Sequence, residues 1–367
     1  MKIPLRLKQG FTILRRYRYQ WVIMVTFIWT LIDTLLWSIR TSVPQTEAFE
    51  TPTETRTFGY ALVRFGVVLV MSFLMGYLLV FKFRALFRNR PLWVNFTMKT
   101  LILMGCSFFM NFFVLFGYFF FIQGRTFIGA LKFYYRLPAE KFWLVHGLPM
   151  WLLIFLITQL FIEMSEKYSP GVFADILSGK YIKPQEEDRI VVFLDLKDST
   201  PIAEQLGHSQ YFMFIRDFIH YVSMALLEHD GRIYQYVGDE IVVSWILNKR
   251  NTDKCIQALL EARKALQKHN EHFRRQYGIT PEFRVGVHTG MVMVGEIGMI
   301  KKDLAMSGDT MNTTARIRTA CRELNQRWIV SKDFVVASSL KDFQVTSLGS
   351  IDLKGKGEAM ELYGLKI

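Results

Sequence analysis

The sequence has only three cysteines among 367 residues, Cys106, Cys255 and Cys321, which lie far apart along the chain. An odd number at such wide spacing excludes a disulfide framework and a zinc site with paired cysteine ligands, and the two in the second half favour a reducing compartment. Charged residues are also few, at 21% against 51% hydrophobic residues. This balance excludes a disordered or collagen-like chain.

Acidic residues are scarcest in the first part of the chain. Residues 1–170 contain 19 Lys and Arg but 7 Asp and Glu, whereas the remaining 197 residues contain 26 and 25. The basic excess lies among long apolar stretches, so it argues against a nucleic-acid partner. The length indicates two or three units, and the charge indicates a basic, apolar part followed by a balanced one.

Four long apolar stretches dominate the first part. A helix needs about 20 apolar residues to cross the hydrocarbon core of a bilayer, and all four are long enough. The first is too long for a cleaved signal peptide and lacks a small-residue cleavage site. We therefore predict a four-helix transmembrane domain over residues 1–165, with the lipid bilayer as its partner. The stretches are Trp21–Ile39, Tyr60–Phe81, Leu101–Ile122 and Phe142–Ile162.

The charges of the loops predict the orientation. Basic residues are enriched on the cytoplasmic side of a membrane, and they precede the first stretch and follow the second. The segment between these stretches instead contains Glu47, Glu50 and Glu54. Basic residues in the last loop weaken this contrast. We expect both termini and the second half of the chain in the cytoplasm, with the protein in the cytoplasmic membrane. The basic residues are Lys2, Arg6, Lys8, Arg15, Arg16 and Arg18, then Lys82, Arg84, Arg88, Arg90 and Lys99, and in the last loop Arg125, Lys132, Arg136 and Lys141.

Two apolar stretches each contain one charge, Asp33 in the first and Arg64 in the second. Charges inside membrane spans are costly and are often functional. Two interpretations stay open: the pair is an internal ion pair of the bundle, or it takes part in sensing.

A linker is predicted over residues 166–186, on the cytoplasmic side. Ser169-Pro170-Gly171 breaks the last membrane helix, and Val172–Leu177 forms a short amphipathic segment. The linker is either a plain tether or carries a movement of the last membrane helix to the second half of the chain.

The second half alternates predicted strands and helices. Apolar runs predict strands, and apolar residues at helical spacing predict helices. Gly238-Asp239-Glu240 and Thr289-Gly290 are expected to be the turns of two hairpins. The order is that of the ferredoxin-like β-α-β-β-α-β unit. The strands are Ile190–Leu194, Arg232–Val237, Ile241–Trp245, Phe283–His288 and Met291–Val294, and the helices are Gln210–Leu227, Asp253–Phe273 and Asp309–Arg322.

Two carboxylates are expected to meet at one end of this sheet. Asp195 ends the first strand, and Asp239 lies in the hairpin turn 44 residues later. Two carboxylates on adjacent strands suit Mg²⁺, which adds waters and substrate phosphates as its other ligands. The helix start at Ser199 and Thr200 can bind phosphate, and metal ions on a triphosphate indicate nucleotidyl chemistry. Taken singly, each feature also has an ordinary explanation as turn or capping chemistry.

Five segments in sequence order resemble the class III nucleotidyl cyclases, the family of adenylate and guanylate cyclase catalytic domains. The resemblance covers residues 187–367 and implies an α+β ferredoxin-like cyclase domain after the α-helical transmembrane bundle. The segments are FLDLKDST at 193–200 and YVGDE at 236–240, which resemble the two metal motifs; FRVGVHTG at 283–290, similar to the central strand; SGDTMNTTAR at 307–316, similar to the transition-state helix; and LKGKG at 353–357, similar to the C-terminal signature.

The resemblance assigns roles to the acidic residues. Asp195 and Asp239, helped by the backbone carbonyl of Leu196, would hold two Mg²⁺ or Mn²⁺ ions in each active site. One ion would lower the pKa of the ribose 3′-hydroxyl, which attacks the α-phosphorus. The other would anchor the leaving pyrophosphate.

Further residues are assigned to the nucleotide in the same way. Arg284 and Lys354 would bind the triphosphate, Asn312 would orient the ribose, and Arg316 would stabilise charge on the α-phosphoryl group. Asn312 and Arg316 are four residues apart, so they share one helix face. In this family the metal aspartates and the Asn–Arg helix act from opposite subunits. A head-to-tail homodimer with two equivalent sites is therefore expected.

The residues that would read the base depart from the family pattern. Most adenylate cyclases have Lys where this chain has Gln235, and Asp or Thr where it has Ala305. A glutamine amide both donates and accepts, and an alanine side chain does neither. These residues therefore do not identify the base, and ATP is favoured only because adenylate cyclases are frequent in the family. We expect a membrane-bound adenylate cyclase that makes cyclic AMP from ATP, with GTP as the alternative substrate and a degenerate, nucleotide-binding membrane receptor as a third possibility. A diguanylate cyclase is disfavoured, because the turn at Asp239 lacks the Gly-Gly signature of that family.

Overall fold

The computed structural model describes residues 12–42, 56–83, 86, 91–136, 147–168, 171–300, 302–338, 340, 344–353, 356 and 359–366. The chain forms two compact units, one spanning Arg15–Lys167 and the other containing Tyr168–Ile367. We call them the helical unit and the sheet domain.

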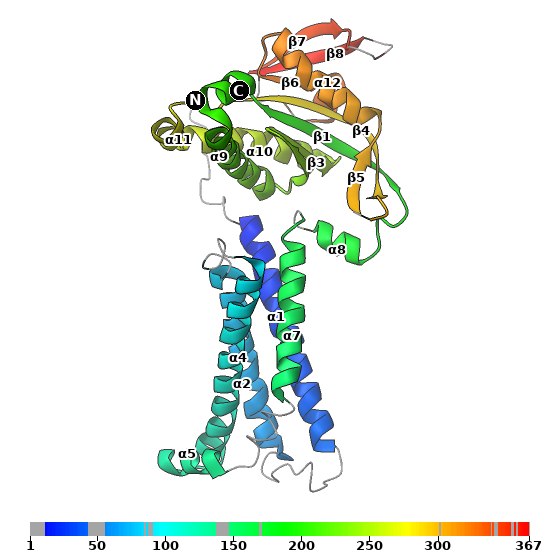
Figure 1. Cartoon of the computed structure of the whole chain (residues 1–367). Coiled ribbons are helices and arrows are strands. Elements are labelled where there is room, and N and C mark those ends of the chain that lie inside the picture. The colour runs from blue at the N-terminus through cyan, green and yellow to red at the C-terminus, as the bar shows by residue number, and fades with distance from the viewer. Residues whose placement is uncertain are drawn as a thin grey trace. The chain divides into compact units, whose positions relative to one another are not determined.

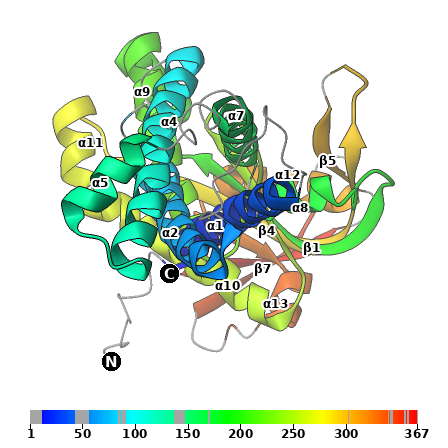
Figure 2. The same ribbon diagram turned by 90° about the horizontal axis from the view of Figure 1, so that it is seen from below.

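The helical unit contains the four apolar helices expected from the sequence. By length and composition, four segments are able to cross a membrane: Arg15–Ile39, Phe58–Phe83, Leu92–Ile122 and Leu148–Ser165. Figure 1 shows α1, α2, α4 and α7 as long rods and the shorter α5 turned away from their direction, and Figure 2 gives the view from below. The helices are α1 (Thr12–Ser42), α2 (Phe58–Tyr77) with the π-helical turn η2 (Leu78–Phe83), α4 (Leu92–Gly117) with η3 (Tyr118–Ile122), α5 (Phe127–Arg136) and α7 (Leu148–Ser165).

Asp33 and Arg64 form an ion pair between α1 and α2. Arg64 Nη2 donates to Asp33 Oδ1 at 2.6 Å, and Arg64 Nε donates to Asp33 Oδ2 at 2.8 Å. Two parallel bonds between a guanidinium and a carboxylate are strong and neutralise both charges. The internal ion pair, one of the two interpretations left open by the sequence, is therefore present.

Polar contacts also join α7 to its neighbours. Lys99 Nζ and Asn95 Nδ2, both on α4, donate to Glu163 Oε1 on α7 at 3.1 Å. The indole nitrogen of Trp29 on α1 donates to Thr158 Oγ1 on α7 at 3.0 Å. Within an apolar solvent such bonds add to van der Waals packing in fixing helix neighbours. Glu47, Glu50 and Glu54 lie outside the described residues, so the orientation in the membrane stays a prediction.

The sheet domain has the expected ferredoxin-like core. Its strand order is β2-β3-β1-β4-β6-β8-β7, with β5 paired to β4, so the order of the first four strands matches the prediction. Strand β1 lies between β3 and β4 and is antiparallel to both. The elements are α8 (Val172–Leu177), β1 (Gln185–Leu196), α9 (Ser199–Glu228), β2 (Arg232–Val237), β3 (Glu240–Ile246), α10 (Lys249–Lys268), α11 (Asn270–Tyr277), β4 (Phe283–Ile297), β5 (Asp303–Ser307), α12 (Asp309–Glu323), β6 (Trp328–Ser331), α13 (Lys332–Ala337), β7 (Gln344–Ile351) and β8 (Met360–Lys366).

Both faces of β1 are buried, because its side chains alternate between two cores. Ile190, Val192 and Leu194 belong to the core that includes residues of α9 and α10. Val191 and Phe193 belong to a second core that includes Met311 of α12. Figure 1 shows α12 on the other side of the sheet from α9 and α10. A strand that is covered on both faces reads as one continuous apolar run, as residues 190–194 do.

The predicted hairpin turn at Thr289-Gly290 is wrong. These residues lie inside one continuous strand, β4, where Thr289 pairs with Ile190 and Gly290 with Arg189 of β1. A Cβ atom on Gly290 would lie 2.6 Å from Oγ1 of Thr310, so the glycine serves the close approach of α12. Glycine inside a strand pattern also marks a close approach of a neighbouring element, which the turn interpretation missed.

The predicted linker contains the expected short helix and is held against the sheet. Val172–Leu177 forms α8, and Arg232 Nη1 at the start of β2 donates to Asp175 Oδ2 of α8 at 2.8 Å. Tyr181 is 1% exposed and belongs to the same core as Val191. Much of this segment therefore packs as part of the sheet domain.

Candidate active site

The two predicted metal-binding carboxylates lie at one end of the central strands. Asp195 is near the end of β1 and pairs with Glu240, the first residue of β3, and Asp239 lies in the turn immediately before it. Burial and the negative charge of Asp239 raise the pKa of Asp195 to about 7, although the positive charge of Arg318 acts to lower it. Asp239 Oδ2 is buried and has no hydrogen-bond partner among the residues that the structure describes. The two carboxylates are therefore close, partly desolvated and short of positive charge.

This environment fits a hard divalent cation. A buried carboxylate oxygen without a partner is costly, and a metal ion removes that cost. In the described part of the chain, no group of three His, Cys, Asp or Glu side chains is placed to hold a metal. The protein's share of the ligands would be the Asp195 and Asp239 carboxylates and the Leu196 carbonyl. Waters and substrate phosphates complete such magnesium sites.

Arg318 of α12 is a member of this site that the sequence analysis missed. Its Nη1 lies 3.4 Å from Asp195 Oδ2, and its Nη2 lies 2.6 Å from Glu240 Oε2. The helix comes so near the sheet at this point that a Cβ on Gly286 would lie 2.5 Å from the backbone nitrogen of Arg318. The glycine within the apolar run of β4 was the signal that could have located this contact.

Asn312 and Arg316 lie on the other side of α12 from Arg318. Consecutive residues of an α-helix are about 100° apart, so Arg316 lies about 160° and Asn312 about 120° from Arg318 around the axis. Asn312 is exposed and Arg316 half-buried. Since Arg318 faces the carboxylates of its own chain, Asn312 and Arg316 face away from them.

The start of α9 leaves its first backbone amides open to a ligand. The N-cap residue Asp198 has a left-handed conformation (φ 57°), and its side chain makes no capping hydrogen bond in the described part of the chain. It instead accepts from Arg284 Nη2 at 3.2 Å. Arg284 is the partner of Asp195 in the β1–β4 ladder. The structure thus brings Ser199, Thr200 and Arg284 to the same edge as the carboxylates, where oxygens of a phosphate find donors.

Gln235 and Ala305 lie on two neighbouring elements, β2 and β5. The β2–β3 register shifts between Ile233 and Gln235, and Gln235 then pairs with Val242 and is exposed. Ala305 is half-buried opposite Gly295 of β4. No hydrogen bond joins the two positions among the described residues.

Of the C-terminal motif, Lys354 lies outside the described residues, but Lys356 is described. Lys356 Nζ lies 3.2 Å from Asp309 Oδ2 and donates to Thr313 Oγ1 at 3.0 Å. The lysine lowers the pKa of Asp309, through its hydrogen bond and its charge. Lys356, the fourth residue of LKGKG, is therefore held at the start of α12, the helix that carries Asn312 and Arg316.

Comparison with known proteins identifies the family of the sheet domain. Residues 182–366 match the family model described as the adenylate and guanylate cyclase catalytic domain. Adenylate cyclase 2 of Rhizobium meliloti is 30% identical over 206 residues, which are 56% of this chain and 57% of that protein. Adenylate cyclase of Anabaena cylindrica is 26% identical over 56% of this chain and 43% of its own length. The chain thus spans about half the length of these relatives.

Guanylate cyclases and a solved structure are also similar. Guanylate cyclase 2D of Rattus norvegicus is 24% identical over 53% of this chain and 18% of its own length. The structure of a bacterial light-regulated adenylyl cyclase aligns with a TM-score of 0.53 and 19% identity, over 59% of this chain and 64% of that one, which supports the fold. The family match covers half of the chain and includes every element of the site described above. This chain belongs to the adenylate and guanylate cyclase family, with four apolar helices ahead of its catalytic domain.

Proposed function

We propose that the protein is a membrane-bound adenylate cyclase that converts ATP to 3′,5′-cyclic AMP and pyrophosphate and works as a homodimer. The observation that carries the proposal is the division of α12 into two sides. Arg318 pairs with Asp195 of its own chain, and Asn312 and Arg316 lie about 120° and 160° away from it around the helix axis. One chain therefore offers a metal-binding side and a ribose-binding side that do not face each other. Two chains placed head to tail form two sites, and each site combines the metal-binding side of one chain with the ribose-binding side of the other.

The carboxylates and the phosphate donors have distinct roles in this proposal. Asp195, Asp239 and the Leu196 carbonyl would hold the divalent ions, which when bound supply charge that activates the 3′-hydroxyl and neutralises the leaving pyrophosphate. Ser199 and Thr200 would bind phosphate at the start of α9. The guanidinium of Arg284 would leave Asp198 to bind triphosphate oxygens, since a triphosphate offers more negative charge than one exposed carboxylate.

The partner chain would supply the remaining groups. Asn312 would orient the ribose, Arg316 would stabilise the charge that develops on the α-phosphoryl group, and Lys354 would bind the triphosphate. Such phosphoryl transfer depends on positioning and charge neutralisation. Lys356, two residues after Lys354 in the sequence, supports this arrangement, because it contacts Asp309 and Thr313 of α12.

ATP is the proposed substrate, and the catalytic domain is proposed to lie in the cytoplasm. The relatives at 30% and 26% identity are named adenylate cyclases, and guanylate cyclases follow at 24%. Gln235 is exposed within β2, and a glutamine amide can turn either its donor or its acceptor towards a base.

The test is an assay of the full chain in detergent with Mg²⁺ or Mn²⁺, given ATP and GTP separately, with products identified by mass. Cyclic AMP from ATP is expected. Cyclic GMP as the only product would show that GTP is the substrate, and the proposed active site would stand. Binding of nucleotide without any cyclic product would contradict the enzyme hypothesis and support the degenerate, nucleotide-binding receptor.

A further inference from the structure

Several large apolar side chains are exposed together on the sheet domain, and we call them the apolar patch. Met299 and Ile300 stand at the tip of the β4–β5 hairpin and are 96% and 104% exposed. Contiguous exposed apolar residues mark sites of protein or membrane interaction, whereas scattered single ones do not. The patch consists of Leu177 at the end of α8, Ile182 in the segment before β1, Ile297 at the end of β4, Met299 and Ile300.

The backbone brings the part of the patch before β1 next to the part on the hairpin. The amide of Glu296, which precedes Ile297, donates to the carbonyl of Tyr181, which precedes Ile182, at 3.2 Å. A Cβ atom on Gly179 would lie 3.0 Å from Cδ1 of Ile182, so the isoleucine side chain reaches back towards the end of α8. The patch is therefore continuous from α8 to the tip of the hairpin.

The chain keeps this patch near the last apolar helix. Helix α7 ends at Ser165, and α8 begins at Val172. The residues between these positions span at most about 25 Å and α8 itself spans about 9 Å, so Leu177 lies within roughly 35 Å of the end of α7. A bilayer around α7 is always within reach of the patch. Contact of a tethered domain with that bilayer is an intramolecular event, so a small apolar area is enough to favour it.

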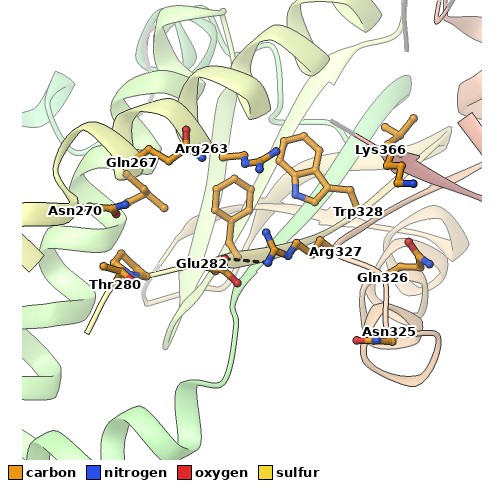
Figure 3. Close-up of a pocket in the computed structure, with 14 residues that line it drawn as sticks. Arg263, Gln267, Asn270, Thr280, Glu282, Asn325, Gln326, Arg327, Trp328 and Lys366 are labelled. Carbon is orange, nitrogen blue, oxygen red and sulfur yellow. Dashed lines mark ion pairs between the residues drawn. The ribbon is translucent and has the colours of Figure 1, made fainter. Parts of the chain in front are cut away.

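The patch lies at the end of β4 that is farther from the candidate active site. The strand begins at Phe283, next to Arg284 of the phosphate-binding edge and beside a pocket of about 310 Å³ in which Glu282 pairs with Arg327 (Figure 3). Ile297 is the last residue of the strand, roughly 45 Å further along at about 3.3 Å per residue. None of the residues assigned to the shared site of the proposed dimer belongs to the patch.

The charges around the patch are balanced. Residues 177–187 and 296–303 together contain four lysines and four acidic residues. Lys180 pairs with Glu187 at 2.9 Å, and Lys302 pairs with Glu296 at 3.7 Å. Such a surface neither attracts nor repels lipid headgroups strongly, so the burial of apolar side chains decides whether it enters a bilayer.

We propose that the apolar patch inserts into the surface of the bilayer that holds the helical unit, with Met299 and Ile300 at the greatest depth. The inference rests on the membrane-bound state in the proposed function. A protruding tip of exposed apolar side chains enters the boundary between headgroups and acyl chains without needing a complementary pocket. Because the charges are balanced, the contact forms on a neutral phosphatidylcholine bilayer.

Spin-label depth measurements on the full chain in phosphatidylcholine nanodiscs test the contact. One label is placed at Met299→Cys, and the control label at Val336→Cys of α13, a position that is 77% exposed and outside the patch. Cys106→Ser removes the one cysteine that is not buried. Relaxation by oxygen, which concentrates in hydrocarbon, is compared with relaxation by a water-soluble nickel chelate. We expect the label at position 299 about 5–10 Å below the lipid phosphates and the label at position 336 in water.

A second set of variants tests whether the apolar tip drives the insertion. The label is placed at Ile297→Cys and combined with Met299→Asp and Ile300→Asp. Both tip side chains are almost fully exposed, so these changes leave the fold intact. The label should move from the bilayer into water. Met299→Leu with Ile300→Leu is the matched control and should keep the label at its depth.

A label at position 299 that stays in water would overturn the proposal, and so would an aspartate pair that leaves the depth at position 297 unchanged. A label shielded from oxygen and chelate alike, in detergent as well as in nanodiscs, would show that protein covers the tip, as a second copy would, and would also overturn it. Cyclase activity of the same samples is measured separately. An inserted tip without any cyclic product would contradict the proposed function and leave the lipid contact supported. Cyclic AMP from a chain whose tip stays in water would contradict the lipid contact alone.

Discussion

Arg318 Nη1 lies 3.4 Å from Asp195 Oδ2, so a helix residue of the chain itself supplies the nearest described cation to the predicted metal ligands. The same guanidinium reaches Glu240 at 2.6 Å. It therefore neutralises part of a three-carboxylate region formed with Asp239. Arg318 thereby connects the carboxylates of Asp195 and Glu240 to α12, the helix that also carries Arg316.

Removal of this guanidinium should destabilise the metal-free protein. In Arg318→Ala, the carboxylates of Asp195 and Glu240 lose a charged partner, which costs about 1–3 kcal/mol. Thermal unfolding of the full chain in EDTA should shift down by several degrees, and Mn²⁺ should recover more stability in the variant than in the unmodified protein. Arg322→Ala, at an exposed position on the same helix, should leave both melting temperatures unchanged. Equal stabilisation by Mn²⁺ in the variant and the unmodified protein would contradict the electrostatic role of Arg318.

The Asp239 carboxylate should be essential for turnover and dispensable for folding. Asp239→Ala removes one of two protein carboxylates for the metal, and loss of one such electrostatic group costs on the order of 10²–10³ in rate. Cyclase assays with saturating Mn²⁺ measure the loss, and circular dichroism checks the fold. Unchanged activity under these conditions would exclude the metal role.

Two inactive variants should restore activity when they are mixed. Asp195→Ala lacks a metal ligand and Arg316→Ala lacks the transition-state cation, so each homodimer is inactive. A heterodimer has one site with neither change. Co-expression with two different affinity tags and purification through both should yield roughly a quarter to a half of the unmodified activity. Inactive heterodimers of demonstrated composition would refute the shared site.

Lys356 should act as a positioning residue for α12. Lys356→Gln removes the contacts to Asp309 and Thr313, and we expect turnover to fall by roughly tenfold while the melting temperature changes by only a few degrees, since exposed pairs contribute less than about 1 kcal/mol. Lys356→Arg should retain most of the activity. Lys332→Gln removes a comparable exposed pair with Glu361, 3.0 Å apart and away from α12, and should have no effect. A similar loss in both glutamine variants would indicate a general charge effect.

The stability of the helical unit should depend on Asp33 and Arg64 being present together. Asp33→Asn leaves the guanidinium of Arg64 without its counter-ion in the bundle, a change that costs about 3–5 kcal/mol when a charge is buried. Detergent-induced unfolding of the full chain should show this loss. The double variant Asp33→Asn, Arg64→Gln removes both charges and should recover most of it. A double variant as unstable as the sum of the single variants would show that the two residues do not depend on each other.

The sequence predicted elements whose signal is local. The four membrane helices follow from apolar runs, and α12 follows from its own periodicity. Asp195 and Asp239 were placed together correctly because strand ends in a known topology share an edge. The predictions failed where a distant segment decided the local structure. Gly290 carries a turn signal, yet it lies within a strand because Thr310 of α12 needs the space above it. Arg318 looks like any solvated charge until the packing of its helix on the sheet is known.

Two glycines of β4 have a mechanical consequence. Gly286 admits the backbone of Arg318, and Gly290 admits the side chain of Thr310, at two separate places along α12. The helix thus approaches β4 closely at two points, which restrict its sliding and rolling on the strand. Asn312 and Arg316 then move with the sheet domain as one rigid body. In the proposed dimer, the relative position of the two sheet domains sets the distance between these groups and the nucleotide bound to the partner. Any control of turnover through the catalytic geometry would therefore act on the dimer interface.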